Sequence, residues 1–198
     1  MKAAQICLDD GICFPILLGE SKKINRVADA NGIDLEGMVI IDPKTDENEE
    51  KRKIFGEQFF TKRGRKGYNR YEAFKIMKDR VHFGCMMLEN GEADAMLAGP
   101  NKDYAQLIRP ALQIIGTEEG VKRIAGMYIL ITKRGPLFLA DTTVNFNPTA
   151  QEIADITMLV AKEVRHFNIK PRVAMLSYSN FGSSNSPEAK LMAEARRL

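Results

Sequence analysis

The stretch from Leu137 to Gln151 constrains the fold more than any other part of this chain. It starts with an apolar run, Leu137 to Ala140, which predicts a short strand, and continues through a polar turn to Pro148. Proline fixes φ near the helical value, so it suits the first turn of a following helix. Open α/β sheets bind ligands where strands end in this way, because the free amides of the helix N-terminus attract phosphate or carboxylate.

The same layout recurs near the end of the chain. Arg172 to Leu176 predicts a second strand, and the polar segment SYSNFGSSNSP follows it. Ser186 is a suitable cap for the last helix, and Pro187 is a suitable first residue. Because two strand ends of this kind follow one another, the sequence predicts a cleft for an anionic ligand.

The first part of the chain alternates between strand and helix patterns. Strands expected over Phe14 to Leu18 and Met38 to Ile41 flank a helix that Ser21 should cap, and this order predicts a parallel β-α-β unit. Ala93 to Ala98 has the small residues of a strand buried in a parallel sheet. Further helices are expected over Lys2 to Asp9, Tyr71 to Met77, Val81 to Glu89 and Tyr104 to Ile115, the last with a kink or break near Arg109 because Pro110 follows.

The pattern changes near residue 117. Two longer strands, Ile124 to Thr132 and Pro136 to Ala140, are joined by a Lys-Arg-Gly turn and predict a hairpin. The helix after Pro148 carries one apolar face. We therefore expect an α/β fold with a parallel sheet flanked by helices, divided into a first α/β lobe (1–116) and part of a second lobe (117–198) that contains a hairpin, a helix, a strand and a helix.

Composition excludes several classes of function. The formal net charge of +3 on 198 residues does not favour nucleic-acid binding. No apolar run approaches the roughly 18 residues that span a bilayer, and the N-terminus lacks a signal-peptide core. Three scattered cysteines with two histidines predict reduced thiols, with neither a disulfide framework nor a zinc site. We expect a cytoplasmic protein with neither a membrane nor a nucleic acid as partner.

The charged segment from Thr45 to Lys66 allows two interpretations. Glu49 and Lys53 are an i, i+4 pair in the favourable direction, which predicts a solvated helix. A basic cluster with two tyrosines follows it. The cluster is either a patch for the phosphates and adenine of a nucleotide-like ligand or a mobile, soluble loop between helices. Its members are Lys62, Arg63, Arg65, Lys66, Tyr68 and Tyr71.

Familiar catalytic motifs do not occur in the sequence. It has neither a GxGxxG after a strand nor a GxxxxGK[ST] loop, and no His-Cys cluster has metal-ligand spacing. Ser177 and Ser179 lack the GxSxG elbow of a nucleophile, so we interpret them as hydroxyls that contact a bound phosphate. His82 is expected to be a packed core histidine, and His166 to be a charge at a helix C-terminus.

Three segments resemble the phosphate acetyltransferase family, which moves an acetyl group between coenzyme A and phosphate. They are RPALQIIGTEEGV, LADTTVNFNPTAQEIADI and PRVAMLSYSNFGSS. The resemblance covers the chain from Lys2 to Leu198. It implies the two-lobed architecture shared with isocitrate and isopropylmalate dehydrogenases, here with an incomplete second lobe and with the coenzyme bound between lobes.

The loop AGPNKDYAQ departs from the hydroxyl-rich loop of that family. With TTVNFNPTA and SYSNFGS, it resembles the acetyltransferase-like C-terminal portion of bacterial NADP-dependent malic enzymes. This resemblance implies a regulatory module that binds acetyl-CoA and supports homo-oligomerisation. NADP and a divalent metal would belong to the malate-oxidising unit of the parent protein, and no cofactor to this chain. A fragment of an active phosphate acetyltransferase, and an interaction module without a ligand, are the alternatives.

The resemblance also implies which residues contact acetyl-CoA or a related acyl carrier. Arg109 of the RPALQ motif would lie near the coenzyme phosphates, or else form a salt bridge to Asp103 or Glu118. Asp141, Asn145 and Asn147 match a block of the family, and turn-stabilising or capping roles are the alternative for these three residues. The remaining predicted contacts are Asn101, Lys102, Asp141, Asn145, Ser177, Ser179 and Gly182. We expect the catalytic segment of the family to lie beyond Leu198, so the resemblance assigns no catalytic residue.

Overall fold

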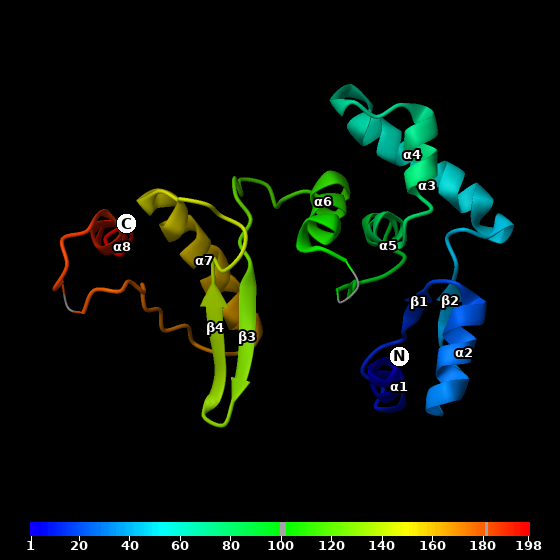
Figure 1. The fold of residues 1–198 in the computed structure, drawn as a ribbon, viewed down its shortest axis with the longest axis horizontal. Helices are drawn as coiled ribbons and strands as arrows, with labels where there is room; N and C mark the ends of the chain where they lie inside the picture. Colours follow the sequence, from blue (N-terminus) through cyan, green and yellow to red (C-terminus); the bar gives the residue numbers. More distant parts are fainter. Residues whose placement is uncertain (100–101, 181) are drawn as a thin grey trace. The chain divides into compact units, whose positions relative to one another are not determined.

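A computed structural model describes residues 1–99, 102–180 and 182–198. The fold is α/β, and its contacts divide the chain into two compact units, Met1–Gly116 and Thr117–Leu198. We call them unit 1 and unit 2 and describe each by itself (Figure 1).

A parallel strand pair opens unit 1. β1 (Ile16–Leu18) pairs with β2 (Val39–Ile41), with Ile16 opposite Val39, and α2 (Ser21–Asn31) connects the two strands. This arrangement confirms the predicted β-α-β unit. The expected cap is wrong, however, because α2 already includes Ser21 and Glu20 occupies the N-cap position without a side-chain hydrogen bond.

The helices of unit 1 follow the expected pattern to within one or two residues. Their stability comes partly from side-chain caps: Asn69 forms a capping box with Glu72, and Asp79 accepts the first amides of the following helix. The helices are α1 (Lys2–Asp9), α3 (Glu49–Arg63), α4 (Arg70–Ile76), α5 (Arg80–Glu89) and α6 (Tyr104–Ile114), with short 3₁₀ turns η1 (Asp46–Asn48) and η2 (Gly64–Lys66).

The expected break in α6 does not occur. The helix continues through Pro110, whose ring is fully buried. A proline inside a helix removes one backbone hydrogen bond. The burial of an apolar ring against the core offsets part of that loss.

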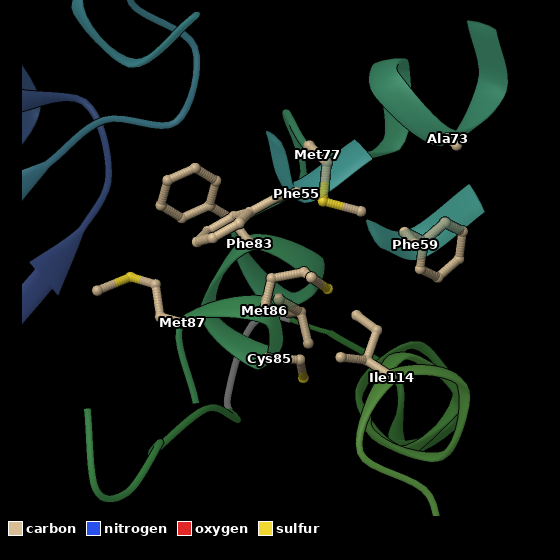
Figure 2. Close-up of a cluster of buried hydrophobic side chains, with 10 residues drawn as sticks. Phe55, Phe59, Ala73, Met77, Phe83, Cys85, Met86, Met87 and Ile114 are labelled. Atoms are coloured by element: carbon tan, nitrogen blue, oxygen red, sulfur yellow. The ribbon is translucent and has the colours of Figure 1, made fainter. Parts of the chain in front are cut away.

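Unit 1 is organised around one hydrophobic core, to which α3 and α5 contribute most of the side chains (Figure 2). The rings of Phe55 and Phe83 lie with their centroids 5.1 Å apart, and Phe59 is completely buried. The prediction of a solvated α3 is therefore wrong for one of its faces. The other face keeps the predicted pair, because Lys53 lies 3.0 Å from Glu49.

The same helix buries a cation. Arg52 is 3% exposed, and its Nη1 donates hydrogen bonds to the carbonyl oxygens of Pro43, at 2.8 Å, and Thr45, at 2.5 Å. These bonds tie the segment after β2 to the first turn of α3. One nitrogen of this buried guanidinium thus holds the loop in place through two backbone carbonyls, while its Nε has no hydrogen-bond partner among the described residues.

The strand predicted over Ala93 to Ala98 is absent. The segment has no strand pairing in the described chain; Met96 packs against the core of unit 1, whereas Leu97 is fully exposed. Alanine and aspartate have low strand propensity, so the apolar character of this segment does not suffice to make it a strand.

Unit 2 begins with the predicted hairpin. β3 (Met127–Thr132) runs antiparallel to β4 (Gly135–Ala140), with Met127 opposite Ala140. Two helices follow. Thr149 caps α7 (Ala150–His166) through a capping box with Glu152, and Ser186 caps α8 (Pro187–Ala195) by accepting from the N–H of Ala189.

These caps confirm one sequence prediction and correct another. Ser186 and Pro187 open α8 as expected. Pro148, in contrast, precedes the cap of α7 and lies outside the helix, because Thr149 is the better cap: its hydroxyl accepts a hydrogen bond.

The strand predicted over Arg172 to Leu176 is also absent. Val173 and Leu176 are exposed, and no strand in the described part of unit 2 lies beside them. A strand exists only where a partner supplies its ladder of hydrogen bonds. The described sheets are accordingly a parallel pair in unit 1 and an antiparallel pair in unit 2, rather than one larger parallel sheet.

The three cysteines are free thiols in different surroundings. Cys13 is exposed, Cys7 is half-buried, and Cys85 is buried in the core of unit 1. Burial, with a smaller contribution from the charge of Asp79, raises the pKa of the Cys85 thiol to about 11. Among the described helices, none has the length and apolar character needed to cross a membrane.

Candidate functional site

Two adjoining clefts lie along α6 in unit 1 and share Ala105, Arg109 and Gln113. The first, which we call the arginine groove, has a volume of about 450 Å³. Its lining consists of the shared residues with Arg63, Ile108 and Leu112. The second, which we call the histidine cleft, has a volume of about 320 Å³. Its lining consists of the shared residues with Tyr68, Ile76, Asp79, His82, Lys102, Gln106 and Pro110.

The end of α3 is held against α6, and this contact positions the arginine groove. Lys62 pairs with Glu89 and donates a 2.9 Å hydrogen bond to the carbonyl of Ile114. A lysine in this position satisfies a free carbonyl at the C-terminus of α6. The next residue, Arg63, then lies in the same groove as Arg109.

The arginine groove combines two cations with an apolar floor. Among the described residues of unit 1, neither Arg63 nor Arg109 forms an ion pair, and the Nε of Arg63 is buried without a hydrogen-bond partner. Ile108 and Leu112 supply the apolar surface. A planar guanidinium binds phosphate through two parallel hydrogen bonds, so this groove favours an anionic ligand with an apolar part.

Asp79 is the centre of the polar network in the histidine cleft. Its Oδ1 accepts from the N–H of Val81 at 3.1 Å and lies 3.0 Å from Nδ1 of His82, while its Oδ2 accepts from Nζ of Lys102. Burial alone would raise the pKa of Asp79, but the hydrogen bonds from His82 and Lys102 hold it well below its usual range. The carboxylate is therefore ionised at neutral pH.

His82 lies between this network and the core. Its ring packs edge-on to Phe59, with centroids 6.1 Å apart, while the residue also lines the histidine cleft. The prediction of a packed core histidine therefore holds for the side of the ring that contacts Phe59, and not for the side that lines the cleft. Tyr68 stands nearby, where its hydroxyl accepts a 3.1 Å hydrogen bond from the amide of Gln113 and its ring packs on Phe59.

The structure brings two of the predicted contact residues together in unit 1. Lys102 and Arg109 line the histidine cleft, and Arg109 also lines the arginine groove. The alternative salt bridge from Arg109 to Asp103 is absent from the described residues. Lys102 is already paired with Asp79. Asn101 lies outside the described residues.

The predicted contacts Asp141 and Asn145 bond to each other in unit 2. The Nδ2 of Asn145 donates to Oδ1 of Asp141 at 2.8 Å and to the carbonyl of Ile124 at 3.0 Å. Asp141 has a positive φ of 56°, and its N–H donates to the carbonyl of Gly126 at 3.0 Å. Both side chains therefore have the turn-stabilising role that the sequence left open as an alternative.

Ser177, Ser179 and Gly182 likewise form a loop through local hydrogen bonds. The hydroxyl of Ser177 accepts from the N–H of Ser179 at 3.3 Å, and the hydroxyl of Ser179 accepts from the N–H of Ser184 at 3.1 Å. Gly182 has a φ of +79°, which a residue without a side chain adopts freely. Ligand contact by these residues stays a prediction.

Sequence reasoning missed Asp79 and Gln113 as cleft residues. A local signal existed for Asp79, because an aspartate three residues before His82 at the start of a helix is placed to cap it and to bond the histidine. No local signal relates Asp79 to Lys102. Within the described residues, no group of three or more His, Cys, Asp or Glu side chains could hold a metal ion.

Comparisons with known proteins identify relatives along the whole chain. The family "Phosphate acetyl/butaryl transferase" matches residues 1–198. The chain is 38% identical to a phosphate acetyltransferase of Nitrosomonas europaea, over 100% of this chain and 28% of that protein. It is 34% identical to an NAD-dependent malic enzyme of Rhizobium meliloti, over 100% of this chain and 26% of that protein.

Solved structures give the same result. A phosphotransacetylase from Streptococcus pyogenes superimposes with a TM-score of 0.81 at 32% identity, over 99% of this chain and 59% of that one. The chain spans only about a quarter of the length of the relatives it matches in sequence: 28% of the phosphate acetyltransferase of Nitrosomonas europaea and 26% of the malic enzyme of Rhizobium meliloti.

Proposed function

This chain belongs to the phosphate acetyl/butaryl transferase family, and we propose that it is a phosphate acetyltransferase-like module that binds acetyl-CoA at the arginine groove of unit 1. One observation carries the proposal. Arg63 and Arg109 line the same groove over an apolar floor, without ion-pair partners among the described residues of unit 1.

The chemistry of acetyl-CoA matches that of the groove. The coenzyme carries phosphate groups, a flat adenine and a largely apolar acyl-bearing arm. Arginine binds phosphate in a bidentate manner and stacks on flat rings, whereas Ile108 and Leu112 would contact the apolar portion. Lys102 would add a further positive charge at the end of α6 nearest the histidine cleft.

The module would act as a sensor within a malic enzyme. The match to a malic enzyme over this entire chain supports that context. Acetyl-CoA would then alter malate oxidation through a difference in affinity between two states of the parent protein. A cytoplasmic homo-oligomer, a two-lobed dehydrogenase-like architecture, and NADP and a divalent metal in the malate-oxidising unit belong to the same proposal. The malic enzyme of Rhizobium meliloti is NAD-dependent. The choice between NAD and NADP is therefore the element of this proposal to test first.

The second candidate function is acetyl transfer itself. The 38% identity to a phosphate acetyltransferase supports it. Formation of acetyl-CoA from acetyl phosphate and coenzyme A by the full-length protein would favour this candidate. Malate oxidation that responds to acetyl-CoA, without acetyl transfer, would favour the sensor.

The predicted contacts in unit 2 form a secondary part of the proposal. Asp141, Asn145, Ser177, Ser179 and Gly182 would contact the ligand only if their local hydrogen bonds were retained or exchanged on binding. Asn101 would contribute next to Lys102.

Isothermal titration calorimetry with acetyl-CoA tests the arginine groove directly. Arg63→Met and Arg109→Met should each weaken binding at least about tenfold, because each removes a charge-assisted bidentate contact. Arg65→Met is the matched control: Arg65 is exposed in η2 and does not line the groove, so its affinity should stay within about twofold. Equal affinities for all four proteins would rule out the groove as the binding site.

A further inference from the structure

The turn that ends α1 brings two cysteines of unit 1 together. α1 ends at Asp9, and Gly11, with a φ of +65°, then reverses the direction of the chain. The N–H of Ile12, at 2.8 Å, and the N–H of Cys13, at 3.3 Å, both donate to the carbonyl oxygen of Cys7. The chain after the helix is thus folded back onto Cys7.

This backbone contact limits the distance between the two cysteines. With standard bond lengths, the 3.3 Å contact keeps the Cα atoms of Cys7 and Cys13 within about 7 Å of each other. Disulfides join Cα atoms that lie roughly 4.4–6.8 Å apart. We propose that Cys7 and Cys13 are a redox-active thiol pair, which a peroxide converts into a disulfide across this turn. Both are free thiols in the structure, so the disulfide belongs to an oxidised form of the protein.

Exposure gives the two thiols different roles. Cys13 is exposed and Cys7 is half-buried, so an oxidant in solution reaches Cys13 first. Asp9 and Asp10 are also exposed and make the turn negatively charged, which favours a neutral oxidant such as hydrogen peroxide over an anionic one. Cys85 takes no part, because it lies in the core, where burial raises the pKa of its thiol to about 11.

The oxidation takes place in two steps. The Cys13 thiolate attacks one oxygen of hydrogen peroxide: an S–O bond forms, the O–O bond breaks, and the departing hydroxide takes up a proton to become water. The Cys7 thiolate then attacks the sulfur of the resulting sulfenic acid, so that the S–S bond forms, the S–O bond breaks and a second water leaves. Together the two thiols lose two electrons and two protons, and the peroxide is reduced to two molecules of water.

The disulfide fastens a helix that is otherwise weakly held. Within α1 no residue is buried. Its Leu8 lies against the turn before β2, where a Cβ on Gly37 would come within 3.1 Å of Cδ2 of Leu8. A cross-link between Cys7 and Cys13 removes the conformations in which the turn after α1 opens. Oxidation should therefore hold Leu8 in its contact with the turn before β2.

Peptide mapping of the full chain after treatment with hydrogen peroxide tests the pair. Both cysteines lie in one tryptic peptide, residues 3–22, because no lysine or arginine occurs between Lys2 and Lys22. After oxidation, unfolding and alkylation, this peptide should carry no alkyl group and should weigh two hydrogens less than the reduced peptide. Cys85 should be alkylated. Dithiothreitol should restore alkylation at both positions of the peptide.

Dimedone measures the second step by itself, because this reagent traps the sulfenic acid in competition with Cys7. In the wild type the disulfide should exceed the dimedone adduct. Cys7→Ser should leave Cys13 as the adduct, since the second thiol is missing. The matched control Cys13→Ser/Phe14→Cys keeps an exposed thiol, but residue 14 has no backbone hydrogen bond to Cys7 within the described part of unit 1. Its ratio of disulfide to adduct should be at least about tenfold lower.

Amide hydrogen exchange measures the effect on α1. The amides of residues 5–13 should exchange at least about threefold more slowly after oxidation and should recover after reduction with dithiothreitol. The amides of α8 are the matched control and should not change, because α8 contains no cysteine. Equal exchange of residues 5–13 in the two redox states would show that the disulfide does not fasten α1.

Three results would overturn the thiol pair itself. One is a peptide 3–22 in which the thiols are alkylated, or oxidised without a disulfide, after peroxide treatment. Another is a disulfide that links Cys7 or Cys13 to Cys85 or to a second chain. The third is an equal ratio of disulfide to adduct in the wild type and the matched control. None of these measurements involves acetyl-CoA, so their outcome is independent of the arginine groove.

Discussion

Unit 1 and unit 2 position their polar side chains in opposite ways. In unit 1, ten buried side chains form one core, and the cations Arg63 and Arg109 extend from helices that pack on it, while Lys102 lies just before α6. In unit 2, the cluster around α7 and α8 has three buried members, Ala150, Ile153 and Ala195. Polar side chains in the turns of unit 2 bond to neighbouring residues.

This difference between the two units indicates which binding groups are preorganised, that is, held in position before a ligand arrives. A side chain on a helix that is fixed by a core keeps its position without a ligand, which lowers the cost of binding. A side chain such as Asn145, which already uses both amide hydrogens in its own turn, must give up those bonds before it contacts a ligand. The binding proposals therefore rest on unit 1.

The strongest test of this contrast removes one aromatic ring from each unit. Phe83→Ala should destabilise unit 1 by about 3–5 kcal/mol, because Phe83 is fully buried against Phe55. Phe146→Ala in unit 2 should change stability by no more than about 0.5 kcal/mol, since Phe146 is 88% exposed. Urea unfolding measures both. Similar effects of the two variants would break the contrast.

A weaker effect is expected for the polar network of the histidine cleft. Asp79→Asn keeps an N-cap oxygen but removes the charge, and should cost about 1 kcal/mol at neutral pH after allowance for solvent screening. The pKa of Asp79 is depressed in the folded protein relative to its ordinary value of 3.8. The stabilisation is therefore present above about pH 4 and is lost as the pH falls through the folded pKa.

Urea unfolding at several pH values checks this expectation. The difference between wild type and Asp79→Asn should be present near neutral pH and should shrink below about pH 4. Asp155→Asn on α7 is the control, because Asp155 is exposed and bonds only to Gln151 among the described residues. A difference that does not shrink below about pH 4 would contradict the ion pair.

An effect confined to local stability is expected in the turn of unit 2. Asn145→Ala removes two hydrogen bonds from a half-buried amide and should lower local stability by about 1 kcal/mol. Amide hydrogen exchange across residues 124–147 measures this loss. If Asn145→Ala lowers the free energy of acetyl-CoA binding by more than it lowers the free energy of unfolding, Asn145 contacts the ligand. Both units would then share the binding role.

Several features set by neighbouring residues were predictable from the sequence, although Ser21 and Pro148 do not occupy the helix positions expected of them. Helix ends at Asn31–Gly32 and Asn90–Gly91, and the cap at Ser186, depend on local backbone chemistry, and they occur where expected. The hairpin was predictable for the same reason, since its strands are joined by a short turn.

Features that need a distant partner were not predictable. The segments 93–98 and 172–176 are apolar, yet a strand forms only beside another strand. The charge pair on α3 correctly described its exposed face, while Phe55 and Phe59 on the other face were overlooked. The ion pair between Asp79 and Lys102 joins two helix starts, and no local pattern relates them.

The free thiols have a practical consequence. Because the Cys85 thiol is enclosed and stays protonated near neutral pH, a maleimide dye reacts first at the exposed Cys13. With Cys7 changed to serine, a single fluorophore then marks the turn after α1. The native sulfur in the core stays unmodified, so ligand titrations can be followed optically without disturbing the packing that supports the two clefts.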